Sequence, residues 1–257
     1  MQNLNVTLIQ TELAWEDKAS NLNHFERQLN EVGETDLILL PEMFTTGFSM
    51  QPKKLAEPMN GESVNWLINQ AEKSMAVITG SLIIEDEGKY FNRLIWAKPD
   101  GTIEYYDKRH LFSMAGEQNY YSAGSKRLLV ELKGWKICPQ VCYDLRFPVW
   151  NRNDIAYDLL FFVANWPAKR NIAWKTLLQA RAIENQTYVA GLNRVGNDGN
   201  MIYHSGDSTL IDPLGEIIYN QADMAFIKTI ELSKARLNFV REKYPFLPDK
   251  DQFYIND

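Results

Sequence analysis

Residues 37–42 read Leu-Ile-Leu-Leu-Pro-Glu, a short apolar run that ends at Pro41 and is followed at once by Glu42. A continuous apolar run of this length predicts a strand that is buried on both faces, as in the parallel sheets of α/β proteins. Glu42 then lies at the carboxyl end of that strand, where open α/β sheets place their ligands. A buried carboxylate there is a competent proton acceptor, although a solvated loop glutamate fits the same pattern.

The segments on either side of this run alternate between strand and helix patterns. Residues 6–10 are typical of a strand, and the apolar spacing after them predicts a helix capped by Asp17 and ended by Gly33. Beyond the run, apolar residues at helical spacing between residues 64 and 75 precede a strand over residues 76–84. Strand–helix–strand–helix–strand is the order expected of an α/β sheet.

The rest of the chain repeats this organisation. Hairpins are predicted from strand-like segments at 92–97 and 102–107, and at 128–132 and 135–141. A strand, a helix and a strand follow at 158–164, 173–186 and 188–193, with turns at 197–200 and 212–215. Two similar halves fit two packed sheets covered by helices. We therefore predict a four-layer α-β-β-α sandwich in a single domain, residues 1–257, with 233–257 as a C-terminal helix and tail.

Length, charge and apolar content argue against several classes of protein. The chain has 257 residues, 45% of them hydrophobic, which is enough for a core that needs no metal or disulfide. Its net charge of −6 opposes nucleic-acid binding. No apolar run approaches the roughly 20 residues of a membrane helix, and the N-terminus lacks the features of a signal peptide. We expect a cytoplasmic protein without membrane or nucleic-acid partners.

The two cysteines, Cys138 and Cys142, are expected to be free thiols. On one strand their Cα atoms lie roughly 13 Å apart, whereas a disulfide needs less than about 7 Å. Cys142 ends its strand-like segment, and Pro148 suits the first turn of a following helix. Such a junction exposes the thiol, lowers its pKa and offers backbone amides to an oxyanion. An isolated cysteine is more often buried and inert, and Cys138 keeps that interpretation.

A short basic segment supplies a second candidate group. Lys108 ends the strand-like segment at 102–107 and is followed by Arg109 and His110. A cation fixed at a strand end stabilises a developing oxyanion, although most single lysines are solvated surface residues. Glu117, in the loop after Gly116, is positioned to orient Lys108 or is merely exposed.

The joint pattern of these residues resembles the nitrilase superfamily of carbon–nitrogen hydrolases. The resemblance runs from Val6 to about Leu232 and is specific through three motifs in the right order: 39–44 (LLPEMF), 106–112 (YDKRHLF) and 141–148 (VCYDLRFP). Further similarity covers 164–167, 174–186, 193–196 and 206–208. It implies a catalytic triad of Glu42, Lys108 and Cys142. As a hypothesis of mechanism, Glu117 is a fourth catalytic residue that holds Lys108 and the substrate in place. The resemblance also implies the α-β-β-α sandwich, no metal or cofactor, and a homodimer or larger assembly.

Within this superfamily the chain looks most like the omega-amidases, which act on omega-amides of 2-oxo acids such as 2-oxoglutaramate. The expected reaction is hydrolysis of a small carboxamide to carboxylate and ammonia through a cysteine thioester. A substrate carboxylate calls for a cation, for which Lys169 and Arg170 are the candidates, whereas Arg146 is interpreted as structural. The apolar walls are expected from four aromatic residues: Phe44, Phe48, Tyr143 and Trp166.

Other functions use the same residues differently. A metal-dependent phosphoesterase of similar layered fold would bind a cation through Glu42, with help from Asn165, Asp207 and His204. A Cys-His hydrolase would use one of the three histidines: His24, His110 or His204. Another nitrilase activity, such as N-carbamoyl hydrolysis, and a non-enzymatic interaction module also remain open.

Overall fold

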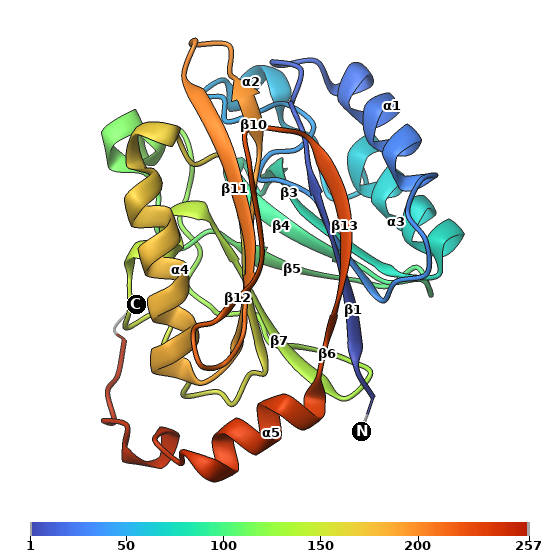
Figure 1. Ribbon diagram of the computed structural model, residues 1–257. Helices are drawn as coiled ribbons and strands as arrows, with labels where there is room; N and C mark the ends of the chain where they lie inside the picture. Colours follow the sequence, from blue (N-terminus) through green and yellow to red (C-terminus); the bar gives the residue numbers. More distant parts are fainter. Residues whose placement is uncertain (1, 256–257) are drawn as a thin grey trace.

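Two β-sheets face each other in the middle of the molecule, and helices cover their outer faces (Figure 1). The computed structural model describes residues 2–255. The first sheet has the order β13-β1-β2-β3-β4-β5, with bounds Phe226–Leu232, Leu4–Gln10, Leu37–Leu39, Val77–Asp86, Lys89–Ala97 and Ile103–Asp107. The second has the order β10-β11-β9-β8-β7-β6, with bounds Val195–Asn197, Tyr203–Ile211, Tyr188–Asn193, Leu159–Ala164, Trp135–Val141 and Val130–Leu132. A further strand, β12 (Ile217–Ala222), pairs with β11.

Helices form the outer layers. Those of the first sheet are α1 (Lys18–Leu29), the short α2 (Pro52–Leu55) and α3 (Glu62–Ser74). Helix α4 (Asn171–Asn185) covers the second sheet, and α5 (Lys234–Lys243) follows β13 near the C-terminus (Figure 1). No helix within residues 2–255 is long and apolar enough to span a membrane. The predicted α-β-β-α sandwich is confirmed.

Strand β2 is buried on both faces, as its sequence predicts. Leu37 and Leu39 belong to the cluster between the two sheets, whereas Ile38 and Leu40 belong to the cluster beneath α1 and α3. This alternation follows from the two-residue period of a strand. β2 pairs in parallel with β1 and β3, so it occupies the middle of the first sheet.

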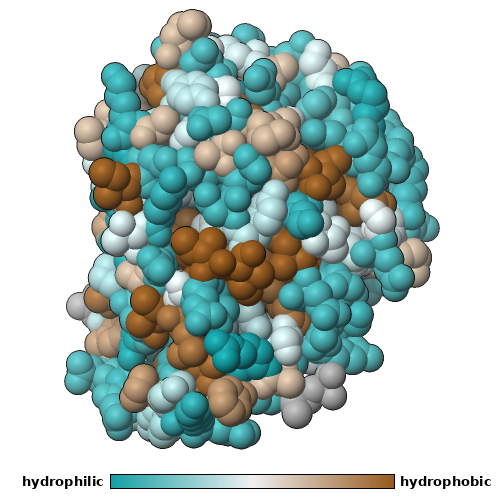
Figure 2. Space-filling model, viewed as in Figure 1, coloured by the Kyte–Doolittle hydropathy of each residue, from teal (hydrophilic) through white to brown (hydrophobic). Residues whose placement is uncertain are grey.

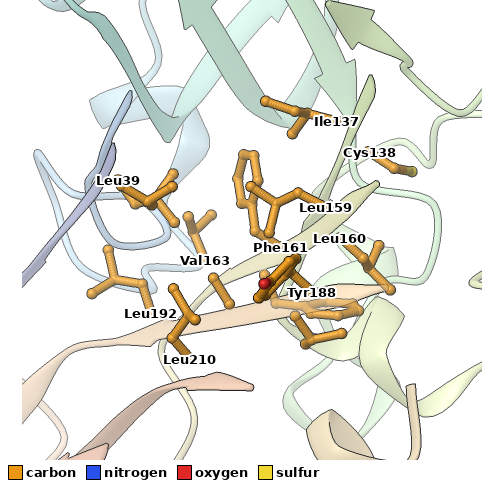
Figure 3. Close-up of a cluster of buried hydrophobic side chains, with 14 of the residues drawn as sticks. Leu39, Ile137, Cys138, Leu159, Leu160, Phe161, Val163, Tyr188, Leu192 and Leu210 are labelled. Atoms are coloured by element: carbon orange, nitrogen blue, oxygen red, sulfur yellow. The ribbon is translucent and has the colours of Figure 1, made fainter. Parts of the chain in front are cut away.

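The core between the sheets is built from large apolar side chains. Trp96 of β4 stacks on Phe161 of β8, with ring centroids 6.3 Å apart. Figure 3 shows Leu39 from the first sheet in the same cluster as Val163 and Leu192 from the second. This packing fixes the relative position of the strand ends that carry the polar groups described below.

Helix α1 begins as expected but ends early. The Asp17 carboxylate accepts a hydrogen bond from the Ser20 amide at 3.0 Å, which caps the helix. The helix ends at Leu29, not at Gly33, so the predicted boundary is wrong. Glu31 and Val32 instead donate to carbonyls three residues back, which closes the last turn without a left-handed residue.

The topology brings several strand ends to one edge of the sandwich. Strands β3, β4 and β5 form two successive antiparallel pairs, so β5 runs in the same direction as β2. Strands β7 and β8 are parallel to each other in the second sheet. The residues that follow β2, β5, β7 and β8 are Glu42, Lys108, Cys142 and Asn165, within three residues of each strand end.

Candidate active site

A buried ion cluster lies where these strand ends meet. The Lys108 ammonium donates to Glu42 Oε1 at 2.9 Å and to the two carboxylate oxygens of Glu117 at 3.1 and 2.9 Å. All three side chains are fully buried. The structure therefore brings together three of the four residues expected to be catalytic, and it excludes the exposed alternatives for Lys108 and Glu117.

The carboxylate of Glu42 is held from several directions. Asn92 Nδ2 donates to Glu42 Oε1 at 2.8 Å and also reaches Glu117 Oε1 at 3.3 Å. The Asn165 amide donates to Glu42 Oε2 at 2.8 Å. Asn92 was not among the predicted site residues, because an asparagine inside a hairpin strand carries no signal that it faces a buried carboxylate.

Cys142 sits at a strained turn directly after β7. Its φ of 45° lies in the left-handed region, which a residue with a side chain adopts only when its surroundings enforce it. The residues Cys142–Arg146 form a single 3-10 turn, and no α-helix follows within the region before β8. The expected strand-to-helix junction is therefore wrong in its second half, because the turn ends at Arg146 before Pro148.

Asp144 joins this turn to the segment that carries Lys108. Its buried carboxylate accepts hydrogen bonds from the Val141 amide at 3.1 Å and from the Tyr106 hydroxyl at 2.8 Å. It also accepts from the His110 amide at 2.9 Å. Because Tyr106 and His110 flank Lys108, one carboxylate anchors both the turn of Cys142 and the segment of Lys108.

The electrostatic surroundings hold a proton on the thiol. Burial raises the pKa of Cys142 well above its usual value, and the negative charge of Glu42 and a hydrogen bond with it raise it further, against the opposing effect of Lys108. The predicted lowering of this pKa is wrong, because burial and the charge of Glu42 outweigh Lys108. The turn that begins at Cys142 is also a 3-10 turn and not the start of an α-helix. Burial alone lowers the pKa of Lys108, but Glu117 and Glu42 raise it overall, so the ammonium stays charged.

A small cavity of about 80 Å³ opens onto Cys142, a residue that is 8% exposed. Four of the expected substrate-binding residues line it: Phe48, Tyr143, Trp166 and Arg170. Phe44 does not, since it is fully buried in the core and packs edge-on against Phe25 at 5.4 Å. Lys169 is exposed and also lies outside the lining.

Two arginines give the cavity a positive wall. Arg146, expected to be structural, lines it together with Arg170. The Arg146 guanidinium lies 5.1 Å from the Trp166 ring, and that of Arg170 lies 4.9 Å from the Phe112 ring. Within residues 2–255 neither arginine forms an ion pair with a carboxylate. Both cations are therefore free to bind an anionic group of a ligand.

Comparison with known proteins assigns the family. The family model described as carbon-nitrogen hydrolase matches residues 5–237. The chain belongs to the carbon-nitrogen hydrolase family. It is 50% identical to omega-amidase YafV of Escherichia coli K12 over 256 residues, which cover 99% of this chain and 100% of the relative. It is 32% identical to the 2-oxoglutaramate amidase of Bacillus subtilis over 95% of this chain and 96% of that protein.

Solved structures of this hydrolase family share the fold. XC1258 from Xanthomonas campestris, a CN-hydrolase superfamily protein with an arsenic adduct in its active site, matches with a TM-score of 0.98. The two are 46% identical, and the match covers 100% of both chains. Saccharomyces cerevisiae Nit3 matches with a TM-score of 0.84 and 26% identity over 95% of each chain. The predicted superfamily and amidohydrolase class are confirmed.

The alternative functions fit the geometry of this hydrolase poorly. Within the described residues no group of three histidine, cysteine, aspartate or glutamate side chains is placed to hold a metal ion. His24 bonds Thr11, and His110 bonds Asp144. His204 lines the cavity, but burial and Arg194 lower its pKa to about 4, and the hydrogen-bond partner of the thiol is Glu42.

Replacing Glu42 with glutamine tests the electrostatics of the thiol. The variant removes a negative charge that raises the pKa of Cys142, so that pKa should fall while catalysis is lost. A fall of one unit makes alkylation by iodoacetamide about 10-fold faster at neutral pH. Alkylation rates across a pH series, followed by mass spectrometry, measure this. Cys138, whose pKa burial raises to about 11, is the internal control and should react slowly in both proteins. An unchanged pH profile for Cys142 would contradict this electrostatic coupling.

Proposed function

We propose that this chain hydrolyses the terminal amide of a small 2-oxo acid, such as 2-oxoglutaramate, to a carboxylate and ammonia. The observation that carries the proposal is that Cys142, which lines a small cavity, interacts with the buried Glu42–Lys108 ion pair. The wall of that cavity contains two arginines without a carboxylate partner in residues 2–255. The names of the relatives, omega-amidase and 2-oxoglutaramate amidase, support the same substrate class.

Acylation begins with transfer of the Cys142 proton to Glu42. The sulfur attacks the amide carbonyl, and the C–O double bond opens to a tetrahedral oxyanion. The Lys108 ammonium and the Tyr143 backbone amide stabilise this oxyanion. Glu42 then returns its proton to the nitrogen, the C–N bond breaks, and ammonia leaves a thioester on Cys142.

Deacylation uses the same groups. Glu42 takes a proton from a water molecule, and the resulting hydroxide attacks the thioester carbonyl. The C–S bond breaks, the acid product leaves, and the proton returns to Cys142. Glu117 does not touch the reacting atoms in this scheme; it holds the Lys108 ammonium in place.

The thioester mechanism requires a free thiol. Cys138 and Cys142 are both free cysteines. A reducing compartment keeps thiols in this state, which supports a cytoplasmic location that cell fractionation tests directly.

Ammonia release from a substrate panel tests the proposed reaction. We expect turnover of 2-oxoglutaramate and little or none of an N-carbamoyl amino acid or a simple nitrile. Cys142→Ala should abolish ammonia release, since it removes the thiol that is hydrogen-bonded to Glu42, while leaving the melting temperature nearly unchanged. Cys138→Ala is the matched control and should retain activity. Equal ammonia release by wild type and Cys142→Ala would remove the nucleophile assignment.

Arg146 and Arg170 are the proposed partners of the substrate carboxylate. A guanidinium binds a carboxylate through paired N–H groups, and a partly dry cavity strengthens that attraction. Arg146 belongs to the turn that carries Cys142, and Arg170 immediately precedes α4. A carboxylate held by them lies at one end of the cavity while the amide lies at the other, at Cys142.

Replacing either arginine with methionine tests this role. The value of kcat/KM for glutaramate should fall about 10- to 100-fold, mainly through KM, because a charged hydrogen bond is lost. Pentanamide, which has no carboxylate, should be affected by no more than about threefold. Lys169→Met removes a neighbouring cation outside the cavity and should change neither substrate. Equal losses of kcat/KM for both amides would show that the arginines do not bind the substrate carboxylate.

A homodimer or larger assembly is the proposed oligomeric state. Ile183 of α4 is 53% exposed and lies against the β11–β12 turn, where Leu214 is 38% exposed and Ile217 is 59% exposed. Figure 2 shows apolar side chains gathered on this face, over the region of β11 and β12. Clustered apolar surface of this kind is typical of protein–protein contacts.

A charge placed in this apolar cluster tests the assembly. Ile183→Glu should shift the mass measured by light scattering towards the monomer, because a buried unpaired carboxylate opposes association. Met75→Glu, an exposed position at the end of α3 in the opposite outer layer, should leave the mass unchanged. A wild-type protein that is monomeric at micromolar concentration would end this proposal.

A further inference from the structure

Asn165 has a buried oxygen that nothing in the described chain satisfies. The residue follows β8, is 6% exposed, and lines the cavity together with Cys142. Its Oδ1 atom is buried and has no hydrogen-bond partner within residues 2–255. Buried side-chain acceptors without partners are rare in folded proteins and call for an explanation.

The chemistry of its neighbour fixes which way the Asn165 amide points. Its side chain lies 2.6 Å from the backbone oxygen of Glu42. A carbonyl oxygen only accepts hydrogen bonds, so the atom facing it must be the amide nitrogen, Nδ2. The backbone N–H of Asn165 is also occupied, by Glu42 Oε2 at 2.8 Å. Nδ2 therefore has a partner, whereas the buried Oδ1, which can only accept, has none within residues 2–255 and is the atom that we assign to a ligand.

A ligand that satisfies Oδ1 must supply a donor close to Glu42. In a 2-oxo acid omega-amide the carboxylate, the oxo group and the amide oxygen are all acceptors. The two N–H groups of the carboxamide are its only donors. In the proposed mechanism Glu42 returns a proton to that nitrogen, so the nitrogen must approach the Glu42 carboxylate. Asn165 forms two hydrogen bonds with Glu42 and therefore lies close to the same place.

We propose that Asn165 Oδ1 accepts a hydrogen bond from the N–H of the scissile carboxamide, which makes Asn165 the residue that selects amides over esters. The inference rests on the proposed function, since it needs an amide bound at Cys142. One N–H of the amide then faces Glu42 and the other faces Asn165. An ester oxygen in the same place offers no donor and leaves Oδ1 unpaired, so the ester loses the interaction that the amide gains.

The test compares an amide with its ester in matched variants. Wild type, Asn165→Leu and Asn193→Leu are assayed for kcat/KM on glutaramate and on monomethyl glutarate. Leucine keeps the approximate shape of asparagine but has no acceptor. Asn193 is the control because its side chain bonds the amide and carbonyl of Trp166, holds the same segment, and does not line the cavity. Thermal melting and alkylation of Cys142 verify that each variant is folded.

Asn165→Leu should lower kcat/KM for glutaramate about 10- to 100-fold more than for the ester. Asn193→Leu should lower both by the same factor. If Asn165→Leu also lowers both equally, Asn165 only positions Glu42, and the inference is overturned while the amidase function stands. The inference is likewise overturned if Asn165→Leu lowers neither activity. If wild type hydrolyses the ester but no carboxamide, the proposed function fails and this inference fails with it.

Discussion

A buried ammonium between two carboxylates is the constraint on which the site depends. A lysine without solvent is stable only when it is paired and hydrogen-bonded, and Lys108 meets both conditions through Glu42 and Glu117. The two carboxylates would repel each other without the ammonium, and the amide of Asn92 bridges them. Pairing of these three charges therefore fixes how the segments after β2 and β5 and the loop of Glu117 lie relative to one another.

The thiol of Cys142 is kept neutral by the same cluster. A largely buried sulfur beside Glu42 keeps its proton, although Lys108 lies nearby. In the mechanism that we propose, the proton passes from this thiol to Glu42 as the sulfur attacks a carbonyl. The strained φ of Cys142 turns the chain directly after β7 and leaves the residue lining the cavity.

The sequence predicted the sandwich from local patterns, but the convergence of distant residues came from the family resemblance. The alternation around Leu37 and Leu39 was readable because β2 is buried on both faces. Strand β11 was missed because Gly206, Asp207 and Ser208 interrupt its apolar alternation. The hidden roles of Asn92 and Arg146 had no local signal, since neither spacing nor composition tells which way a polar side chain points across a sheet. Phe44 was misassigned as a cavity residue because its place in the motif does not show that its side chain points into the core.

The carboxylate of Asp144 has a consequence for how this chain tolerates change. It accepts hydrogen bonds both from the turn of Cys142 and from the residues that flank Lys108. Two segments that are distant in sequence, with His110 and Asp144 34 residues apart, therefore share one partner. Free-energy effects of substitutions in the two segments will not add, because either one unseats the common anchor. The effect of a substitution in one segment therefore depends on which residues occupy the other.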